Sequence, residues 1–414
     1  MQYISDPNAP NDLYMLIPGT SPSNDYTGQG FPTRRNAATA WFDLSQLYGS
    51  SAANVNGMRA FVGGQIKMNA TTNMLPDLVG GARYVKNPYQ AGDYRVNFHP
   101  GLTAMTTIWA REHNNIASHL AALYPAMDDE ALFQTARLIT GREVVQVHEA
   151  EWSNQLYTDI ADQIVTLGLL QMITPETVVP PQAVLEVPEE FVANYKWHTF
   201  VNPYLTLRTN TGGLVHGAPA QIDYIAQFQD TTVLRTYGLS AVTVGLATAP
   251  CGVQRFNNLA PGLQNHNHPY LVSQPINTMS YPSCQVVPVF DSIATDILRD
   301  RERGIPKYNA MRKLVSAGVF PQANFFDDLS DNAEQAAILA DLYQWDINNV
   351  DAIVGSHGEH MYPHQGFPLT MVAAFVPFVI ARVTLDRFYT ADFTPEKYTQ
   401  WGYERAQSIN FAQV

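Results

Sequence analysis

A tyrosine and a histidine three residues apart are the side chains best suited to chemistry in the stretch VPEEFVANYKWHTFVNPY, residues 187–204. Tyr195 carries a phenol that can donate a hydrogen, and His198 carries an imidazole that can bind a metal or move a proton. Taken alone, His198 is more typical of a hydrogen-bonded core histidine, and Tyr195 of a packed aromatic residue with a bonded hydroxyl. Neighbouring motifs must therefore decide between these interpretations.

A second group of possible metal ligands lies in SHGEHMYPHQG, residues 356–366. Four side chains there suit zinc or non-haem iron: His357, Glu359, His360 and His364. Gly358 and Pro363 disfavour the single helix that would align the three histidines. A polar loop with hydrogen-bonded histidines is the alternative to a metal site.

Alternating polar residues in TAWFDLSQLYG, residues 39–49, offer oxygen atoms to a hard cation. In extended chain every second residue points to the same side. Side-chain oxygens together with a main-chain carbonyl suit calcium. The residues concerned are Thr39, Trp41, Asp43 and Ser45. The same alternation is typical of a solvated strand edge, so both interpretations stay open.

The composition indicates a folded protein with a large core. The chain has 414 residues, of which 46% are hydrophobic and 15% charged, and its net charge is −13. No basic face is available for nucleic acid, so we exclude nucleic acid as a main partner. An anionic substrate must instead meet a local positive charge. Cys251 and Cys284 leave room for one disulfide at most.

The elements that would carry these residues are mainly helices. In residues 101–124 the apolar positions recur at steps of three, four or seven, which predicts a helix. Asp128, followed by acidic residues, predicts the start of the next helix. The apolar run 367–381 is shorter than a bilayer span and contains Pro377, which favours a buried helix. Strands are hard to find, because Pro and Gly interrupt most β-branched runs.

No repeat, low-complexity tract or flexible linker divides the sequence, which favours one large mainly α domain over 1–414. No signal peptide or transmembrane span is recognisable. The cellular compartment, the oligomeric state and any peripheral association with membranes stay open.

Six segments, in the same order, resemble the animal-type haem peroxidase superfamily and, among its branches, the fatty-acid α-dioxygenases. They are RNAATAWFDLSQLYGS (35–50), GDYR (92–95), TIWAREHNNIASHL (107–120), EEFVANYKWH (189–198), RDRERGIPKYNAMR (299–312) and LDRFYT (385–390). The resemblance implies a haem peroxidase fold with haem b, and it identifies residues 39–45 with the calcium loop of the superfamily. Phe98 and His99 stand where some members attach their haem covalently, so a non-covalent haem is expected.

The resemblance also assigns roles around the haem. It makes His198 the proximal iron ligand, and it puts Asp296 where peroxidases have an asparagine that hydrogen-bonds this histidine. A tyrosine three residues before the histidine is found in cyclooxygenases, α-dioxygenases and fungal diol synthases, so Tyr195 would be the radical tyrosine. Arg95 matches the distal arginine that assists peroxide cleavage, with a surface arginine as the alternative.

QVHEAEWSNQLY, residues 146–157, is similar to an α-dioxygenase segment that binds the substrate carboxylate. By this similarity His148, Ser153 and Arg387 would bind a long-chain fatty acid, and O2 would be the co-substrate. His148 and Ser153 lie about 140° apart on an ideal helix, so sharing one carboxylate requires a break in the helix. For Arg387 a structural ion pair is the alternative.

The resemblance implies a fatty-acid oxygenase that forms a 2-hydroperoxide. The alternatives are a mid-chain dioxygenase, a simple peroxidase and an inactive haem- or lipid-binding protein. The family's distal histidine should precede the calcium loop, but residues 1–38 contain no histidine. We therefore expect the chain to lack the segment that carries the distal histidine and one calcium ligand.

Overall fold

The computed structural model is mainly helical, as the sequence predicts. It describes residues 2–5, 14–17, 38–81, 85–153, 185–223, 229–264, 266–267, 289–360 and 366–414. The chain divides into two compact units. The first unit comprises Met1–Arg35, Val187–Pro203 and Pro250–Val376, and the second comprises Asn36–Glu186, Tyr204–Ala249 and Pro377–Val414. Each unit has its own apolar core.

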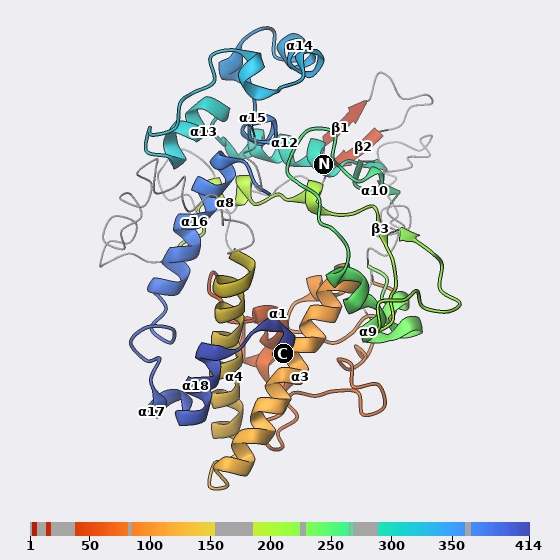
Figure 1. Ribbon diagram of the computed structural model, residues 1–414, viewed down its shortest axis with the longest axis vertical. Helices are drawn as coiled ribbons and strands as arrows, with labels where there is room; N and C mark the ends of the chain where they lie inside the picture. Colours follow the sequence, from red (N-terminus) through yellow and green to blue (C-terminus); the bar gives the residue numbers. More distant parts are fainter. Residues whose placement is uncertain are drawn as a thin grey trace. The chain divides into compact units, whose positions relative to one another are not determined.

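Two long helices form the centre of the second unit, where they run side by side (Figure 1). Helix α3 (Pro100–Leu123) begins with proline, and the His99 side chain accepts the N–H of Gly101 at 3.0 Å. Helix α4 (Asp129–Val147) begins behind Asp128, whose carboxylate accepts a main-chain N–H at 2.8 Å. Both helices confirm the sequence-based predictions to within one residue.

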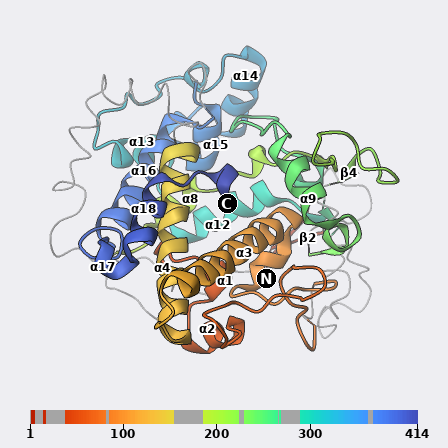
Figure 2. The ribbon, with the colours of Figure 1, turned by 60° about the horizontal axis from the view of Figure 1, so that its bottom comes forward.

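Shorter elements surround α3 and α4 in the second unit. Helix α18 packs on α4, and helix α9 packs on α3 (Figure 2). The elements are α1 (Ser45–Tyr48), α2 (Ala52–Met58), η1 (Tyr94–Phe98), η2 (His148–Ser153), β3 (Tyr204–Leu205), β4 (Ile222–Asp223), α9 (Thr232–Ala247), α17 (Pro395–Tyr398), α18 (Gln400–Ser408) and η7 (Phe411–Gln413).

The core of the second unit has two apolar clusters. One includes Leu47, Tyr48 and Phe133, and the other includes Ile139 and Tyr398, all of them fully buried. Both clusters draw on α4, so burial of apolar surface on two sides fixes this helix. The C-terminal end of α4 carries His148 and is therefore held by a rigid element.

The first unit combines short strands with helices. Its strands follow the order β1-β2-β6-β5, with β2 and β6 parallel and the other pairs antiparallel. The elements are β1 (Gln2–Ser5), β2 (Tyr14–Ile17), α8 (Glu189–Asn194), η3 (His198–Phe200), α10 (Pro261–Gln264), β5 (His266–Asn267), β6 (Val289–Phe290), α12 (Ser292–Arg303), α13 (Tyr308–Val315), η5 (Phe326–Leu329), α14 (Ala333–Leu342), η6 (Ile347–Asn349) and α15 (Ala352–Gly358).

Helix α15 contacts α8, α12 and α13 in the first unit. Its approach to α13 depends on Gly355, since a Cβ at this position would lie 2.1 Å from Cγ of Tyr308. A larger residue would push the helices apart. This packing holds α8 and α12, the helices that carry or flank the candidate functional residues.

Helix α16 (Leu369–Thr384) corresponds to the apolar run that the sequence predicts as a buried helix, and Pro377 lies within it. The first unit includes the chain up to Val376, and the second resumes at Pro377. Among the described residues, none of the helices combines the length and apolar character needed to cross a bilayer.

Candidate functional site

Tyr195 and His198 lie at the two ends of a short non-helical link in the first unit. Helix α8 ends at Asn194, and the capping residue Tyr195 has φ −92° and ψ 48° and donates its N–H to the Phe191 carbonyl at 2.8 Å. The 3-10 helix η3 begins at His198. Because the backbone is not helical between the two residues, the directions of their side chains are not fixed by the geometry of one helix.

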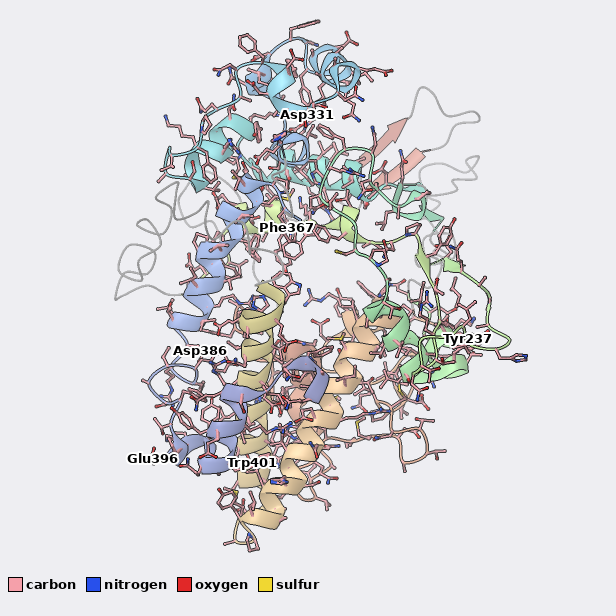
Figure 3. All side chains as sticks on the ribbon, viewed as in Figure 1. Tyr237, Asp331, Phe367, Asp386, Glu396 and Trp401 are labelled. Carbon is pink, nitrogen blue, oxygen red and sulfur yellow. The ribbon has the colours of Figure 1, made fainter. Side chains whose placement is uncertain are left out.

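Two aromatic side chains pack against Tyr195. Its ring stacks on Phe191 with 4.8 Å between centroids, and its centroid lies 3.9 Å from that of Trp197. Trp197 in turn lies 4.4 Å from Phe367, which Figure 3 labels. Tyr195 nevertheless keeps 46% of its surface exposed. It is therefore held in place without being an ordinary core aromatic.

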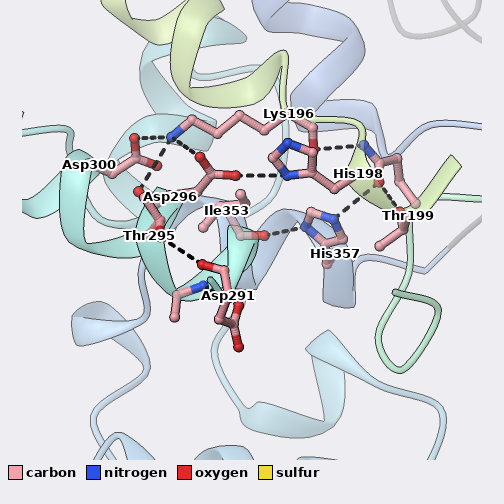
Figure 4. Close-up of polar contacts among 11 residues, drawn as sticks. Lys196, His198, Thr199, Asp291, Thr295, Asp296, Asp300, Ile353 and His357 are labelled. Carbon is pink, nitrogen blue, oxygen red and sulfur yellow. Dashed lines mark hydrogen bonds and ion pairs between the residues drawn. The ribbon is translucent and has the colours of Figure 1, made fainter. Parts of the chain in front are cut away.

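His198 faces a buried carboxylate. Its Nδ1 lies 2.9 Å from Oδ2 of Asp296 (Figure 4), and the side chains are 34% and 7% exposed. The contact has the distance of an ion pair but not the angles of a hydrogen bond, and with Nδ1 against the carboxylate, Nε2 is the nitrogen left to bind a metal. A histidine oriented by a carboxylate through one nitrogen is typical of a metal ligand. The residues present thus fit a histidine that would hold a haem iron through Nε2.

A lysine joins this carboxylate to a second one. Asp296 and Asp300 lie one turn apart on α12 and point the same way. Lys196 Nζ lies 2.5 Å from an oxygen of Asp300 and 3.8 Å from one of Asp296 (Figure 4). Burial raises the pKa of Asp300 to about 6, although the charge of Lys196 opposes this.

Gln254 fixes the main chain of the link. This fully buried side chain donates from Nε2 to the Lys196 carbonyl at 3.1 Å. Its Oε1 accepts the Thr199 hydroxyl and lies 3.2 Å from Nε2 of His357. His357 Nδ1 lies 2.7 Å from the Ile353 carbonyl, and burial lowers the pKa of His357. The link therefore has a buried polar support.

The possible zinc or iron ligands of residues 356–366 have separate partners. His357 makes the contacts above, and Glu359 lies 2.8 Å from the Arg312 guanidinium. His360 is exposed and lies 3.0 Å from an aspartate carboxylate, while His364 is outside the described residues. Within the described ranges no three His, Cys, Asp or Glu side chains are grouped to hold a metal ion.

The predicted calcium loop lies in the second unit, where bends over residues 38–43 lead into helix α1 at Ser45. Thr39 Oγ1 accepts the N–H of Trp41, and Asp43 Oδ1 accepts the N–H of Ser45, each at 3.1 Å. The Trp41 carbonyl accepts from Arg382 at 3.1 Å. Burial raises the pKa of Asp43. Hydrogen bonds from the Thr39 side chain and the Ser45 N–H oppose this increase. Thr39, Trp41 and Asp43 line one cleft, while calcium binding stays a prediction.

A cleft of about 500 Å³ adjoins this loop, and Asp43, Arg137, Asp386 and Arg387 line it. Burial raises the pKa of Asp386, and the negative charge of Asp43 adds to the effect. Asp386 (labelled in Figure 3) is therefore a second carboxylate beside the loop that sequence reasoning missed. Apolar side chains such as Leu138, Leu385 and Phe388 line the rest of the cleft, which therefore combines charged and apolar groups.

Arg95 lies in η1 with its side chain 54% exposed. Its guanidinium pairs twice with Asp93, with Nε 2.9 Å from Oδ1 and Nη2 2.5 Å from Oδ2. Arg95 thus has a carboxylate partner within its own unit, and its expected distal role stays a prediction. His99, close by in sequence, caps α3.

His148 lies where α4 changes to the π-helix η2 (His148–Ser153), so the chain leaves α-helical geometry between His148 and Ser153 while the shared-carboxylate role stays a prediction. The Ser153 side chain is outside the described residues. The His148 ring lies 5.1 Å from that of Phe42. Burial, together with the nearby charge of Arg382, lowers the pKa of His148 to about 4, so the ring is neutral at pH 7.

Arg382, near the end of α16, is an arginine beside His148. Its guanidinium lies 3.7 Å from the ring centroid of Phe42 and hydrogen-bonds Trp41. Arg387, which sequence comparison favoured, is 70% exposed and lies 3.1 Å from Asp392. Sequence reasoning missed Arg382. An arginine near the end of an apolar helix can itself indicate a binding site, because a partly buried cation requires an anionic or hydrogen-bonding partner.

The family model for animal haem peroxidase matches residues 6–414. Alpha-dioxygenase 2 of Arabidopsis thaliana is 27% identical over 401 residues, which cover 89% of this chain and 59% of that protein. Alpha-dioxygenase PIOX of Nicotiana tabacum is 26% identical over 401 residues, with coverage of 89% and 58%. The chain thus spans less than two thirds of the length of these relatives.

Solved structures show the same fold. The fatty acid alpha-dioxygenase of Oryza sativa matches with a TM-score of 0.74 and 20% identity, covering 99% of this chain and 70% of that one. Peroxidase A of Dictyostelium discoideum matches with a TM-score of 0.69 and 20% identity, covering 90% and 67%. Since a dioxygenase and a peroxidase both match, the fold does not choose between the two activities.

Proposed function

The chain belongs to the animal haem peroxidase family, and from this premise we propose that it is a haem-dependent oxygenase that adds O2 to a long-chain fatty acid. The observation that carries the proposal is the link in which a half-exposed Tyr195 and a carboxylate-oriented His198 lie three residues apart. The alpha-dioxygenases among the relatives support the same kind of reaction.

His198 would hold haem b through Nε2, without a covalent bond to the protein. Asp296 would keep the imidazole in the tautomer and orientation that this requires, because it lies 2.9 Å from Nδ1. When bound, haem supplies the one-electron oxidation that the side chains of the protein cannot perform. The chain's own task is to hold the reacting groups in place.

Tyr195 would transfer hydrogen atoms. In a priming step a hydroperoxide, reduced at the haem site, would supply the oxidising equivalent: Tyr195 would lose one electron to that site and its phenolic proton to solvent. Its phenoxyl oxygen would then take a hydrogen atom from a C–H bond of the fatty acid. O2 adds to the resulting carbon radical, and the peroxyl radical takes the hydrogen atom back from the phenol. The net reaction converts fatty acid and O2 to a hydroperoxide and regenerates the phenoxyl radical of Tyr195. Its packing on Phe191 and Trp197 would limit movement of the phenol.

The fatty-acid carboxylate would bind in the second unit at Arg382 and His148. The −13 net charge of the chain makes a local cation necessary, and the neutral ring of His148 can donate one N–H. Arg387 is the second candidate for the cation, and Ser153 stays a proposed ligand. Anchoring the carboxylate favours reaction at the α-carbon, so the proposed product is a 2-hydroperoxy fatty acid.

Calcium would bind the turn through the Asp43 carboxylate, the hydroxyls of Thr39 and Ser45 and the Trp41 carbonyl. Arg95 would assist peroxide cleavage after exchanging its partner Asp93. Both assignments follow from the family pattern. The loop geometry supports the first, since the Thr39 and Asp43 side chains each accept a main-chain N–H two residues further along the same loop.

The test is Tyr195→Phe, which removes the phenolic hydrogen with little change in volume. We expect loss of O2 uptake with palmitate, while the Soret band and peroxide-dependent oxidation of a small phenol are retained. Tyr204→Phe, at another half-exposed tyrosine, is the control and keeps both activities. Unchanged palmitate oxygenation in Tyr195→Phe would refute the radical role. Phenol oxidation without any palmitate oxygenation in the unaltered protein would favour a peroxidase.

A further inference from the structure

We propose that Lys196 is a positioning residue that limits how strongly Asp296 polarises His198 and so tunes electron donation from His198 to iron. This inference rests on the proposed function, in which His198 binds haem. Lys196 lies between Tyr195 and His198 in sequence, and its side chain reaches the carboxylates of helix α12 (Figure 4).

One cation serves two carboxylates in this network. Lys196 Nζ lies 2.5 Å from Asp300 Oδ1 and 3.8 Å from Asp296 Oδ1, and it donates to the main-chain carbonyl of Asp296 at 3.4 Å. The three side chains are only 10%, 4% and 7% exposed, in the order Lys196, Asp300 and Asp296. Solvent and salt therefore screen these charges weakly.

The charge on Asp296 decides how strongly it attracts the Nδ1 proton of His198. A more basic carboxylate makes the imidazole a stronger electron donor through Nε2. Lys196 opposes this because it stabilises the negative charge of Asp296. Asp300 in turn draws Lys196 away, as the shorter distance shows. The electron donation from His198 thus depends on how closely the Lys196 ammonium group approaches each of the two carboxylates.

The main chain keeps Lys196 in this position. Gln254, which is fully buried, donates to the Lys196 carbonyl at 3.1 Å, and the same residue contacts Thr199 beyond His198. The lysine side chain therefore extends from a fixed point toward α12. A flexible surface lysine would have no such constraint.

Two variants that each remove one charge give opposite predictions. In Lys196→Met the charge of Asp296 is unopposed, so we expect a lower reduction potential of the bound iron and a higher iron–histidine stretching frequency in resonance Raman spectra. In Asp300→Asn, Asp296 is the remaining carboxylate beside Lys196, so the reduction potential of the iron should rise and the iron–histidine stretching frequency should fall. Lys196→Arg keeps the charge and should restore values close to those of the unaltered protein.

The control is Lys307→Met, the same substitution at a lysine 2.6 Å from the buried Asp351. It should leave the potential and the iron–histidine frequency unchanged. The measurements are a spectroelectrochemical titration and a resonance Raman spectrum of each haem-loaded variant. If Lys196→Met does not fold, Asp300→Asn decides, and an unchanged or lowered potential in it overturns the proposal.

The outcomes separate this inference from the proposed function. Bound haem with shifts of the same sign in Lys196→Met and Asp300→Asn, or with no shifts, overturns the role of Lys196 alone. A potential shift without a change in the iron–histidine frequency also overturns it, because the charge then acts on iron directly and not through His198. Failure of the unaltered protein to bind haem overturns the proposed function, and this inference with it.

Discussion

Replacing Arg382 with glutamine should weaken the binding of a fatty acid. Arg382 lies beside His148, with its guanidinium over Phe42 and one N–H on the Trp41 carbonyl. A hydrogen bond between charged groups contributes about 1.5–3 kcal/mol. Its loss corresponds to a decrease in affinity of roughly 10- to 150-fold. The expected loss of affinity applies to ligands that carry a carboxylate and not to ligands that share only the alkyl chain.

Arg387→Gln provides the matched control because it removes the same charge five residues further along the chain. Its side chain is 70% exposed and pairs with Asp392 at 3.1 Å. Exposed ion pairs contribute roughly 0–1 kcal/mol to stability. We therefore expect nearly unchanged fatty-acid affinity and a small change in the free energy of unfolding.

The assay measures dissociation constants for palmitate and for hexadecanol by calorimetric titration. Arg382→Gln should weaken palmitate binding by the amount above and leave hexadecanol binding nearly unchanged, whereas Arg387→Gln should affect neither. Thermal unfolding of both variants checks that the native structure is retained. A weaker affinity for palmitate in Arg387→Gln, with Arg382→Gln unaffected, would refute the reasoning and restore Arg387 as the carboxylate ligand.

Two further predictions concern stability. Burial, with the like charge of Glu112, raises the pKa of Glu143 to about 8 from an ordinary 4.5, and Arg405 offsets this only in part. The folded state then binds the proton more tightly than the unfolded state, so the free energy of unfolding should fall as pH rises from about 5 to 8, by up to about 1.4 kcal/mol per pH unit. Glu143→Gln should make Tm depend less on pH over this range. A Tm that falls as steeply in Glu143→Gln as in the unaltered protein would contradict the prediction. Calcium should raise Tm in the unaltered protein but not in Asp43→Asn, by preferential binding to the folded state; an equal rise in both would exclude Asp43 as a ligand.

The long helices could be predicted from sequence because their signals are local. Asp128 caps α4 and His99 caps α3, and both helices show a repeated apolar pattern. The strands of the first unit are only two to four residues long, for example β5 and β6, and so carry no readable alternation. Their pairing depends on partners distant in sequence.

The candidate site divides in the same way. The spacing of Tyr195 and His198 is visible in the sequence, as is their match to a family pattern. The roles of Lys196 and Gln254 are not, because their partners lie far along the chain: Lys196 pairs with Asp300, and Gln254 binds the Lys196 carbonyl. Only the packing of α12 and the link brings these groups together.

The two arginines near the end of α16 show a further limit of sequence comparison. Arg387 belongs to a recognisable pattern, whereas Arg382 lies beside His148. Which of two arginines five residues apart faces a given side chain depends on where the helix ends and how the chain continues. In this protein α16 ends at Thr384, between the two arginines.

The central claim is that His198 binds the haem iron, and the absorption spectrum of the haem-loaded protein tests it most directly. The unaltered protein should bind one haem per chain and show a Soret band, and His198→Ala should lose that band or shift it strongly. His360→Ala, at an exposed histidine paired with Asp331, should retain the unaltered spectrum. A spectrum and haem affinity in His198→Ala identical to those of the unaltered protein would contradict the assignment of His198 as the iron ligand.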